Sequence, residues 1–299
     1  MTQKNIILGV AFISLTLACV ACLRLDSNLY NNSEKITAYK FDAYEGGEVA
    51  LPPSYDIPMS RVSLHTFRSD DNGNIAKIYG IYIGDTTTIA TDTVILYAHG
   101  NKYHMDLYWQ RMKLLANVGG KNHYGVLAFD YRGYGLSEGV PTESGMYADA
   151  DACMQWLKSK GLTNNRFVFY GFSLGTACAT ELTANPRTLT PSKLILEAPF
   201  ASAAVMANDA AVIALPVSYI TNLKIDNAEE IKKVQQPLLW LHGTDDDFVR
   251  IATHGEVVFK NYKGIKGVPV RVKGANHSDV PTIMGFDNYI KTILTFLRG

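Results

Sequence analysis

A serine, three adjacent aspartates and a histidine follow one another along the chain in an order that suits nucleophilic catalysis. Ser173 stands in the pentapeptide GFSLG, the aspartates occupy positions 245–247, and His277 lies in the stretch GANHSD. A serine hydroxyl is a weak nucleophile near neutral pH, so it needs a basic partner, and a histidine base needs a carboxylate to orient it. The chain order Ser, Asp, His is the one used where the serine lies on a sharp turn between a strand and a helix.

The residues on either side of Ser173 predict such a turn. Arg166–Tyr170 reads RFVFY, an apolar run typical of a buried strand. The residues after Ser173 are small or favour helices, and Gly171 and Gly175 leave room for closely packed backbone. The alternative is a polar serine in a glycine-rich turn, and the junction favours the nucleophile.

Two histidines follow the aspartates and compete for the role of base. His254 lies in IATHGEVVFKNY, a pattern that predicts a helix, and we expect it to be structural. His277 lies in a loop that directly follows a predicted apolar strand, which is where a catalytic base is expected.

The elements that must position these residues alternate along the chain. A DDNGN sequence predicts a hairpin turn at Asp71–Asn74 between two alternating runs. The strands are expected at Arg61–Phe67, Ile75–Ile83, Thr93–Ala98, Tyr124–Phe129, Arg166–Tyr170, Lys193–Glu197, Pro237–Leu241 and Val268–Val272. The helices are expected at Met105–Val118, Glu143–Lys160, Asn227–Val234 and about Thr282–Leu297. This alternation predicts an α/β fold with a mostly parallel eight-stranded sheet, helices on both faces, and a ligand site at the carboxyl ends of the strands.

Composition excludes several classes of protein. The chain has 299 residues, 47% of them hydrophobic and 19% charged, and a formal net charge of zero, which suits one large globular domain. Because no basic run occurs, a nucleic acid partner is not expected. Cys153 and Cys178 fall in helical patterns without metal-binding spacing, so we expect buried free thiols, no metal and no cofactor.

The N-terminus differs from the rest. Ile6–Leu23 is an uncharged stretch of 18 residues that resembles a secretory signal or an N-terminal anchor. Three alternatives stay open: a lipoprotein modified at Cys22 or Cys19, an uncleaved helix anchor, and a cleaved signal. All three place the protein on a membrane or outside the cytoplasm. We therefore expect a signal or anchor segment at 1–25, a tether and extension at 26–60 whose polar part is Asp26–Lys40, and the main domain at 61–299.

Five motifs at the ends of predicted strands carry a family resemblance. They are HGN at 99–101, DYRGYGLSEG at 130–139, GFSLG at 171–175, HGTDDDFV at 242–249 and GANHSD at 274–279. Together they resemble the α/β-hydrolase superfamily, and within it the serine-aminopeptidase-like and monoacylglycerol-lipase-like branch. The resemblance runs from about Val62 to the C-terminus. It is specific for the fold and the Ser-His-Asp triad, and weak for the substrate.

The resemblance selects one acid among the three aspartates. In the family pattern H-G-x-x-D-x-x-V-P the acid stands four residues after the histidine, which corresponds to Asp246 here, with Arg250 in place of the usual proline. Because three adjacent carboxylates cannot all be buried, Asp245 and Asp247 are expected to face water.

An oxyanion hole needs two backbone N–H groups aimed at the developing charge. The residue after the nucleophile, Leu174, should supply one from a helix N-terminus. The resemblance implies that Asn101 supplies the other. Lys102 follows it, either as a solvated lysine or as a group that favours an acidic substrate. The resemblance also makes His99, His242, Asp130 and Arg132 supports of the neighbouring loops.

These features predict a serine hydrolase that cleaves a carboxylic ester or thioester, lipid-like acyl substrates included. The alternatives are an amidase or aminopeptidase-like enzyme and a non-catalytic hydrolase-fold binding protein, which would have a broken triad. The segment between Phe200 and Gln236 allows only a minimal cap. Its apolar part, Ala211–Ile220, either lines an acyl pocket or packs on the core.

Overall fold

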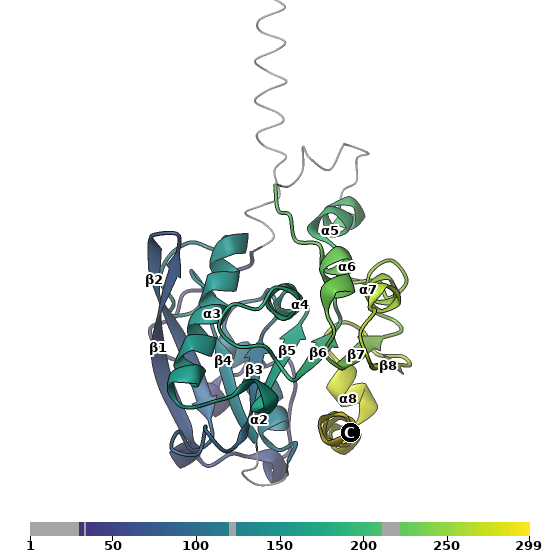
Figure 1. The fold of residues 1–299 in the computed structure, drawn as a ribbon. Coiled ribbons are helices and arrows are strands. Elements are labelled where there is room, and N and C mark those ends of the chain that lie inside the picture. The colour runs from purple at the N-terminus through teal and green to yellow at the C-terminus, as the bar shows by residue number, and fades with distance from the viewer. Residues whose placement is uncertain (1–29, 33, 120–123, 211–221) are drawn as a thin grey trace, which may run out of the picture.

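An eight-stranded sheet runs through the computed structural model, which describes residues 30–32, 34–119, 124–210 and 222–299. The strand order is β1-β2-β4-β3-β5-β6-β7-β8 (Figure 1). The first two strands are antiparallel to their neighbours, and all later pairs are parallel. The strands are β1 (Val62–Asp71), β2 (Asn74–Ile83), β3 (Thr93–Ala98), β4 (Tyr124–Phe129), β5 (Phe167–Phe172), β6 (Lys193–Glu197), β7 (Leu238–Gly243) and β8 (Gly267–Val272). The predicted mostly parallel eight-stranded sheet is confirmed.

Helices cover both faces of the sheet, as predicted. Val94 and Leu96 of β3 pack with one set of helices, and the alternate residues Ile95 and Tyr97 pack with the other. The α-helices are α2 (Met105–Ala116), α3 (Glu143–Ser159), α4 (Gly175–Ala184), α5 (Ala203–Ala210), α6 (Asn227–Glu230), α7 (Gly255–Asn261), α8 (Val280–Met284) and α9 (Phe286–Arg298). Buried residues of α2 and α9 lie on one face, and those of α3, α4 and α7 lie on the other. Short 3-10 turns are η2 (Phe41–Ala43), η3 (Pro53–Tyr55), η4 (Met59–Arg61), η5 (Asn164–Arg166) and η7 (Ile231–Lys233).

Local sequence explains most of these boundaries. Asn72 and Gly73 both have positive φ, 51° and 91°, as a two-residue hairpin turn requires, so the predicted hairpin is confirmed. Asp226 caps α6 by accepting a hydrogen bond from the Glu229 N–H, and the predicted capped helix ends in the turn η7. Cys153 and Cys178 are buried and unpaired, as predicted, and burial raises the pKa of both thiols.

Two helix predictions are wrong in detail. The single C-terminal helix is broken at Gly285, whose φ of +81° separates α8 from α9. The residues from Ile251 to His254 form turns, and α7 begins only at Gly255, with His254 in the capping position. Both patterns have helical periodicity, and a glycine stands at each observed boundary: Gly285 between α8 and α9, and Gly255 as the first residue of α7.

The extension before β1 contradicts the predicted tether. The Tyr39 hydroxyl donates to Asp130 Oδ2 at 2.6 Å, and the Lys40 and Phe41 N–H groups each donate to the Asp106 carboxylate at 2.8 Å. Val49, further along the same extension, is buried. The expectation of few contacts for Asp26–Lys40 is therefore wrong for its described part, because its polar composition hides aromatic and hydrogen-bonding residues that dock on α2.

The predicted apolar segment Ile6–Leu23 lies outside the described residues. Within the described ranges, no helix combines the length and the apolar character needed to cross a bilayer.

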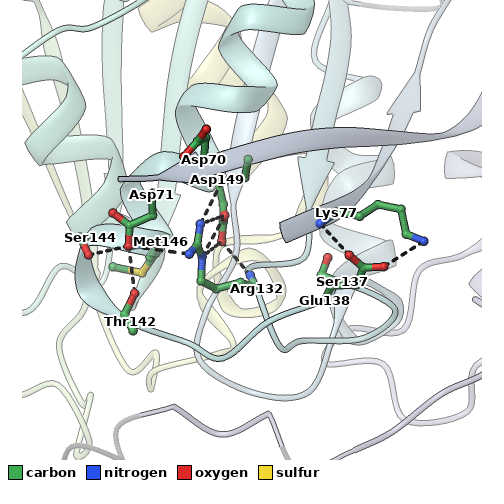
Figure 2. A network of polar contacts seen from close by, with 12 residues as sticks. Asp70, Asp71, Lys77, Arg132, Ser137, Glu138, Thr142, Ser144, Met146 and Asp149 are labelled. Carbon is green, nitrogen blue, oxygen red and sulfur yellow. Dashed lines mark hydrogen bonds and ion pairs between the residues drawn. The ribbon is translucent and has the colours of Figure 1, made fainter. Parts of the chain in front are cut away.

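A buried arginine fixes the loop that follows β4, and Figure 2 shows its contacts. The Arg132 guanidinium donates to Asp149 Oδ1 on α3 at 2.9 Å and to Ser69 Oγ on β1 at 3.0 Å, and it lies 3.7 Å from Asp71. Lys77 on β2 pairs with Glu138 of the same loop at 3.1 Å. These contacts give Arg132 the scaffold role that was predicted for it.

Candidate active site

Ser173 lies on a tight turn between β5 and α4. Its φ is +51°, a conformation that is uncommon outside glycine and that often marks a functional turn. The turn is held by the Ser173 N–H, which donates to the Glu197 carbonyl at 3.0 Å. No side chain fits at Gly175, because a Cβ there would lie 2.0 Å from the Ala98 carbonyl oxygen. This close approach of α4 to β3 explains the second glycine of the pentapeptide.

The structure brings Ser173, His277 and Asp246 together in one hydrogen-bonded chain. His277 Nε2 lies 2.9 Å from Ser173 Oγ, and His277 Nδ1 lies 2.8 Å from Asp246 Oδ2. An ionised carboxylate only accepts, so Nδ1 carries the proton and Nε2 is free to accept the serine proton. The three residues follow β5, β7 and β8, whose parallel carboxyl ends meet at one edge of the sheet.

Asp246 is buried and firmly held, whereas its neighbours are not. Its Oδ1 accepts hydrogen bonds from the Phe248 N–H at 3.0 Å and the Val249 N–H at 2.7 Å. Burial alone would raise the pKa of Asp246, but hydrogen bonds from His242, His277 and Val249 outweigh it and hold the pKa well below its usual range. The carboxylate therefore stays charged at neutral pH.

The two flanking aspartates, Asp245 and Asp247, are exposed, as predicted from the cost of burying three charges. His242 was predicted to be structural, and its Nε2 lies 3.3 Å from Asp246 Oδ2. The same Nε2 lies closer to the Val249 carbonyl, at 2.8 Å, so His242 contacts both Asp246 and the loop that holds it, a proximity that the sequence did not indicate.

Two backbone N–H groups beside Ser173 lack an acceptor among the described residues: those of Leu174 and Asn101. Leu174 precedes α4 directly, and the Asn101 side chain is fixed by accepting from the Tyr134 hydroxyl at 2.7 Å and from the Asn31 N–H at 3.0 Å. Free donors at this place are what an oxyanion hole requires. The Lys102 side chain beside them is exposed.

The loop that carries Asn101 rests on buried polar groups. His99 Nδ1 lies 2.7 Å from the Gly100 carbonyl, and its Nε2 lies 3.1 Å from Asp130 Oδ1. The same Oδ1 accepts from the Met105 N–H at the start of α2 at 2.8 Å, and Asp130 Oδ2 accepts from the Tyr39 hydroxyl at 2.6 Å. The predicted supporting roles of His99 and Asp130 agree with these contacts.

A pocket of about 560 Å³ opens over Ser173, a volume in the range of small-molecule sites. It is lined by Asn31, Glu48, Gly100, Asn101, Lys102, Tyr108, Phe172, Ser173, Asp247, Phe248, Asn276, His277, Ser278 and Asp279. Sequence reasoning missed Phe248, whose exposed ring lies 5.1 Å from the His277 ring, although its place in the HGTDDDFV motif was a usable signal. It also missed Asn31 and Glu48, for which no local signal exists.

The second histidine lies outside this pocket. His254 Nδ1 accepts from the Ala201 N–H at 3.1 Å, and its Nε2 lies 3.2 Å from Asp209. Burial lowers the pKa of His254, so the ring is held neutral as a structural element. In the part of the chain that the structure describes, no group of three or more His, Cys, Asp or Glu side chains is arranged to hold a metal ion.

Comparisons with known proteins agree with this fold. The family model described as serine aminopeptidase, S33, matches residues 90–229. The alpha/beta hydrolase domain-containing protein 17B of Homo sapiens is 27% identical over 210 residues, which cover 68% of this chain and 65% of that protein. Protein 17C of Mus musculus is 26% identical over 211 residues, 68% of this chain and 59% of that protein. The match thus spans somewhat less than two thirds of these relatives.

Solved structures share the fold. An esterase of Pyrococcus furiosus superposes with a TM-score of 0.66 at 16% identity, covering 90% of this chain and 97% of the esterase. A cold-adapted esterase from an Arctic intertidal metagenomic library superposes with a TM-score of 0.56 at 19% identity, covering 79% of this chain and 94% of that esterase. This chain therefore has the α/β-hydrolase fold. The match to the serine aminopeptidase S33 family model and the similarity to these relatives support the predicted resemblance to the α/β-hydrolase superfamily and its S33-like branch.

Proposed function

We propose that this α/β-hydrolase is a serine hydrolase that cleaves a carboxylic ester or thioester of a small acyl substrate through an acyl-enzyme. The hydrogen-bonded chain from Ser173 through His277 to Asp246 carries the proposal. The fold relatives that are esterases are consistent with it.

The proposed reaction uses each group in turn. Ser173 Oγ attacks the carbonyl carbon while its proton passes to His277 Nε2, and the charged Asp246 stabilises the resulting imidazolium. The Leu174 and Asn101 N–H groups bind the negative oxygen of the tetrahedral intermediate. When this intermediate collapses, the alcohol or thiol leaves with the proton from His277, and the acyl group stays on Ser173. A water molecule then gives its proton to His277 and attacks the acyl-enzyme, which releases the acid and restores the serine.

An amidase or aminopeptidase-like activity is the second candidate. The carboxylates of Asp247 and Asp279 line the pocket, and a substrate with a free amine would find an opposite charge there. The family model's description points the same way. The non-catalytic alternative required a broken triad, and the intact arrangement argues against it.

The test uses the full-length chain in mild detergent. A panel of p-nitrophenyl esters of several acyl lengths, thioesters and aminoacyl amides is assayed, together with covalent labelling by a fluorophosphonate. We expect ester or thioester turnover, labelling on Ser173 alone, and loss of both in Ser173→Ala, while Ser144→Ala, which changes an exposed serine, retains both. Labelling of another serine would overturn the nucleophile, and turnover of amides alone would favour the second candidate.

We also propose that residues 1–25 attach the enzyme to a membrane or direct it out of the cytoplasm, with Cys22 or Cys19 as the modified residue if the segment is a lipoprotein signal. The uncharged length of Ile6–Leu23 supports this proposal. In this arrangement 61–299 is the hydrolase domain, and the extension before it is docked on that domain.

A further inference from the structure

A buried arginine beneath the candidate active site contacts three separate segments of the chain. Arg111 on α2 is only 2% exposed. Its Nη1 donates to Glu197 Oε1 at 2.7 Å, its Nη2 to the Ser278 carbonyl at 2.7 Å, and its Nε to Glu48 Oε2 at 2.9 Å. One guanidinium group therefore ties the end of β6, the loop after β8 and the N-terminal extension to the same point.

Each of these attachments lies next to a triad residue. Ser278 directly follows His277, and the Glu197 carbonyl accepts from the Ser173 N–H. The guanidinium also lies 4.1 Å from the centre of the Phe172 ring, which precedes Ser173 and lies 5.4 Å from the His277 ring. Arg111 thus sets the position of the histidine loop relative to the nucleophile turn.

Glu48 completes this arrangement from the extension. While its Oε2 accepts from Arg111, its Oε1 accepts from the Ser278 hydroxyl at 3.1 Å. The backbone of the same residue is fixed, because its N–H donates to the Leu107 carbonyl on α2 at 3.2 Å. Both carboxylate oxygens are therefore occupied by protein donors, which favours a role in holding the loop over a role in binding substrate.

The buried charge of Arg111 explains why position 48 needs a carboxylate. Burial alone would lower the pKa of Arg111, but Glu197 and Glu48 raise it well above its usual value, so the guanidinium stays charged. Glu197 is bound independently by the hydroxyls of Tyr170 and Tyr289. Loss of Glu48 would leave the Arg111–Glu197 pair in place, and the folded core would keep its buried ion pair.

We propose that Glu48 is a positioning residue, which acts with Arg111 on Ser278 to hold His277 in line with Ser173, so that the N-terminal extension forms part of the active site. This inference rests on the proposed serine hydrolase function.

The extension offers a matched control. Asp42 also pairs with a buried cation of α2, accepting from Lys113 Nζ at 2.6 Å, and it accepts from Trp109 Nε1 at 2.9 Å. Asp42 does not line the pocket. Asp42→Ala and Glu48→Ala each remove one pair between the extension and α2, but only the second touches the histidine loop.

The experiment measures kcat, KM, the rate of fluorophosphonate labelling of Ser173, and thermal unfolding in the full-length chain. For Glu48→Ala we expect kcat and the labelling rate to fall about 100-fold, the loss typical of a small misplacement of a reacting group, with KM little changed. Glu48→Gln should recover part of the rate, because its amide oxygen still accepts from Arg111. Asp42→Ala should keep the wild-type kcat whatever it does to the unfolding temperature.

The outcomes distinguish failure of the positioning role of Glu48 from failure of the proposed function. A wild-type kcat and labelling rate in Glu48→Ala, or an equal loss of kcat in Asp42→Ala, would overturn the positioning role while leaving the proposed function intact. Failure of the wild-type protein to label at Ser173 would overturn the proposed function, and the inference with it.

Discussion

Replacing Asp246 by asparagine tests whether this carboxylate controls the tautomer of His277. The structure fixes the orientation of the side-chain amide of the introduced asparagine. The Phe248 and Val249 N–H groups both donate to Oδ1, so the amide oxygen must occupy that position. The amide nitrogen must then face His277 Nδ1. An amide N–H donates, so Nδ1 becomes the acceptor and the ring proton moves to Nε2, facing Ser173.

The expected loss is large because the base is then in the wrong form. With its proton on Nε2, the imidazole cannot accept the proton of Ser173, whose oxygen lies 2.9 Å away. Loss of tautomer control by this route costs about 10⁴-fold in kcat, or about 5 kcal/mol of transition-state stabilisation. The KM should change little, because the pocket walls keep their positions.

The assay is kcat for the best p-nitrophenyl ester of the panel, measured between pH 5 and 9, with the fluorophosphonate labelling rate as a second measure. Asp245→Asn and Asp247→Asn are matched controls, because each substitution removes one charge from the same loop at an exposed residue. They should retain nearly all of the activity. A severe loss in either control, or a mild one in Asp246→Asn, would refute the assignment of the acid.

Three further predictions concern packing, the N-terminus and pH. Gly175→Ala should lower the unfolding temperature by roughly 5–10 °C and reduce activity, because the new Cβ would lie 2.0 Å from the Ala98 carbonyl oxygen; an unchanged melting curve would contradict this packing. Removal of residues 1–25 should release an active enzyme from the membrane fraction, whereas removal of 1–50 should destabilise it, because Arg111 loses Glu48 and Lys113 keeps Asp56 but loses Asp42. Cys22→Ser should abolish membrane attachment only if the segment is a lipoprotein signal. The pKa of Asp246 is lower in the folded than in the unfolded protein, so the charged carboxylate stabilises the fold above about pH 4. This stabilisation is lost as the pH falls through the folded pKa. Between pH 5 and 2 the unfolding temperature of the wild type should therefore fall more steeply than that of Asp246→Asn.

The sheet and the meeting of Ser173, Asp246 and His277 could be predicted from the sequence because their signals are local. Buried parallel strands are continuous apolar runs, and the Asn72-Gly73 pair specifies its turn by backbone conformation alone. Ser173, Asp246 and His277 stand directly after such strands, so the topology by itself predicts that they meet.

The docking of the extension could not be predicted from the sequence, because the contacts that hold it join residues far apart in the chain. Its docking depends on pairs such as Tyr39 with Asp130 and Glu48 with Arg111, which are 91 and 63 residues apart in the chain. No periodicity marks these residues, and an Asn-rich composition resembles that of a linker. The role of Glu48 therefore emerges only when α2 and the loop after β8 are placed beside it.

The contact between Asn31 and Asn101 sets a limit on how far the pocket can stand from a bilayer. Asn31 is fixed at the loop of the candidate oxyanion hole and lines the pocket, and it lies only eight positions beyond Leu23, the last residue of the uncharged stretch. A fully extended chain of that length reaches at most about 29 Å. If Ile6–Leu23 is retained in a membrane, Asn31 lies within roughly the thickness of one bilayer core from the lipid surface, and the proposed nucleophile Ser173 lines the same pocket. Its substrates would then be acyl groups presented at or near that surface, and distance from the membrane would select among esters of similar chemistry.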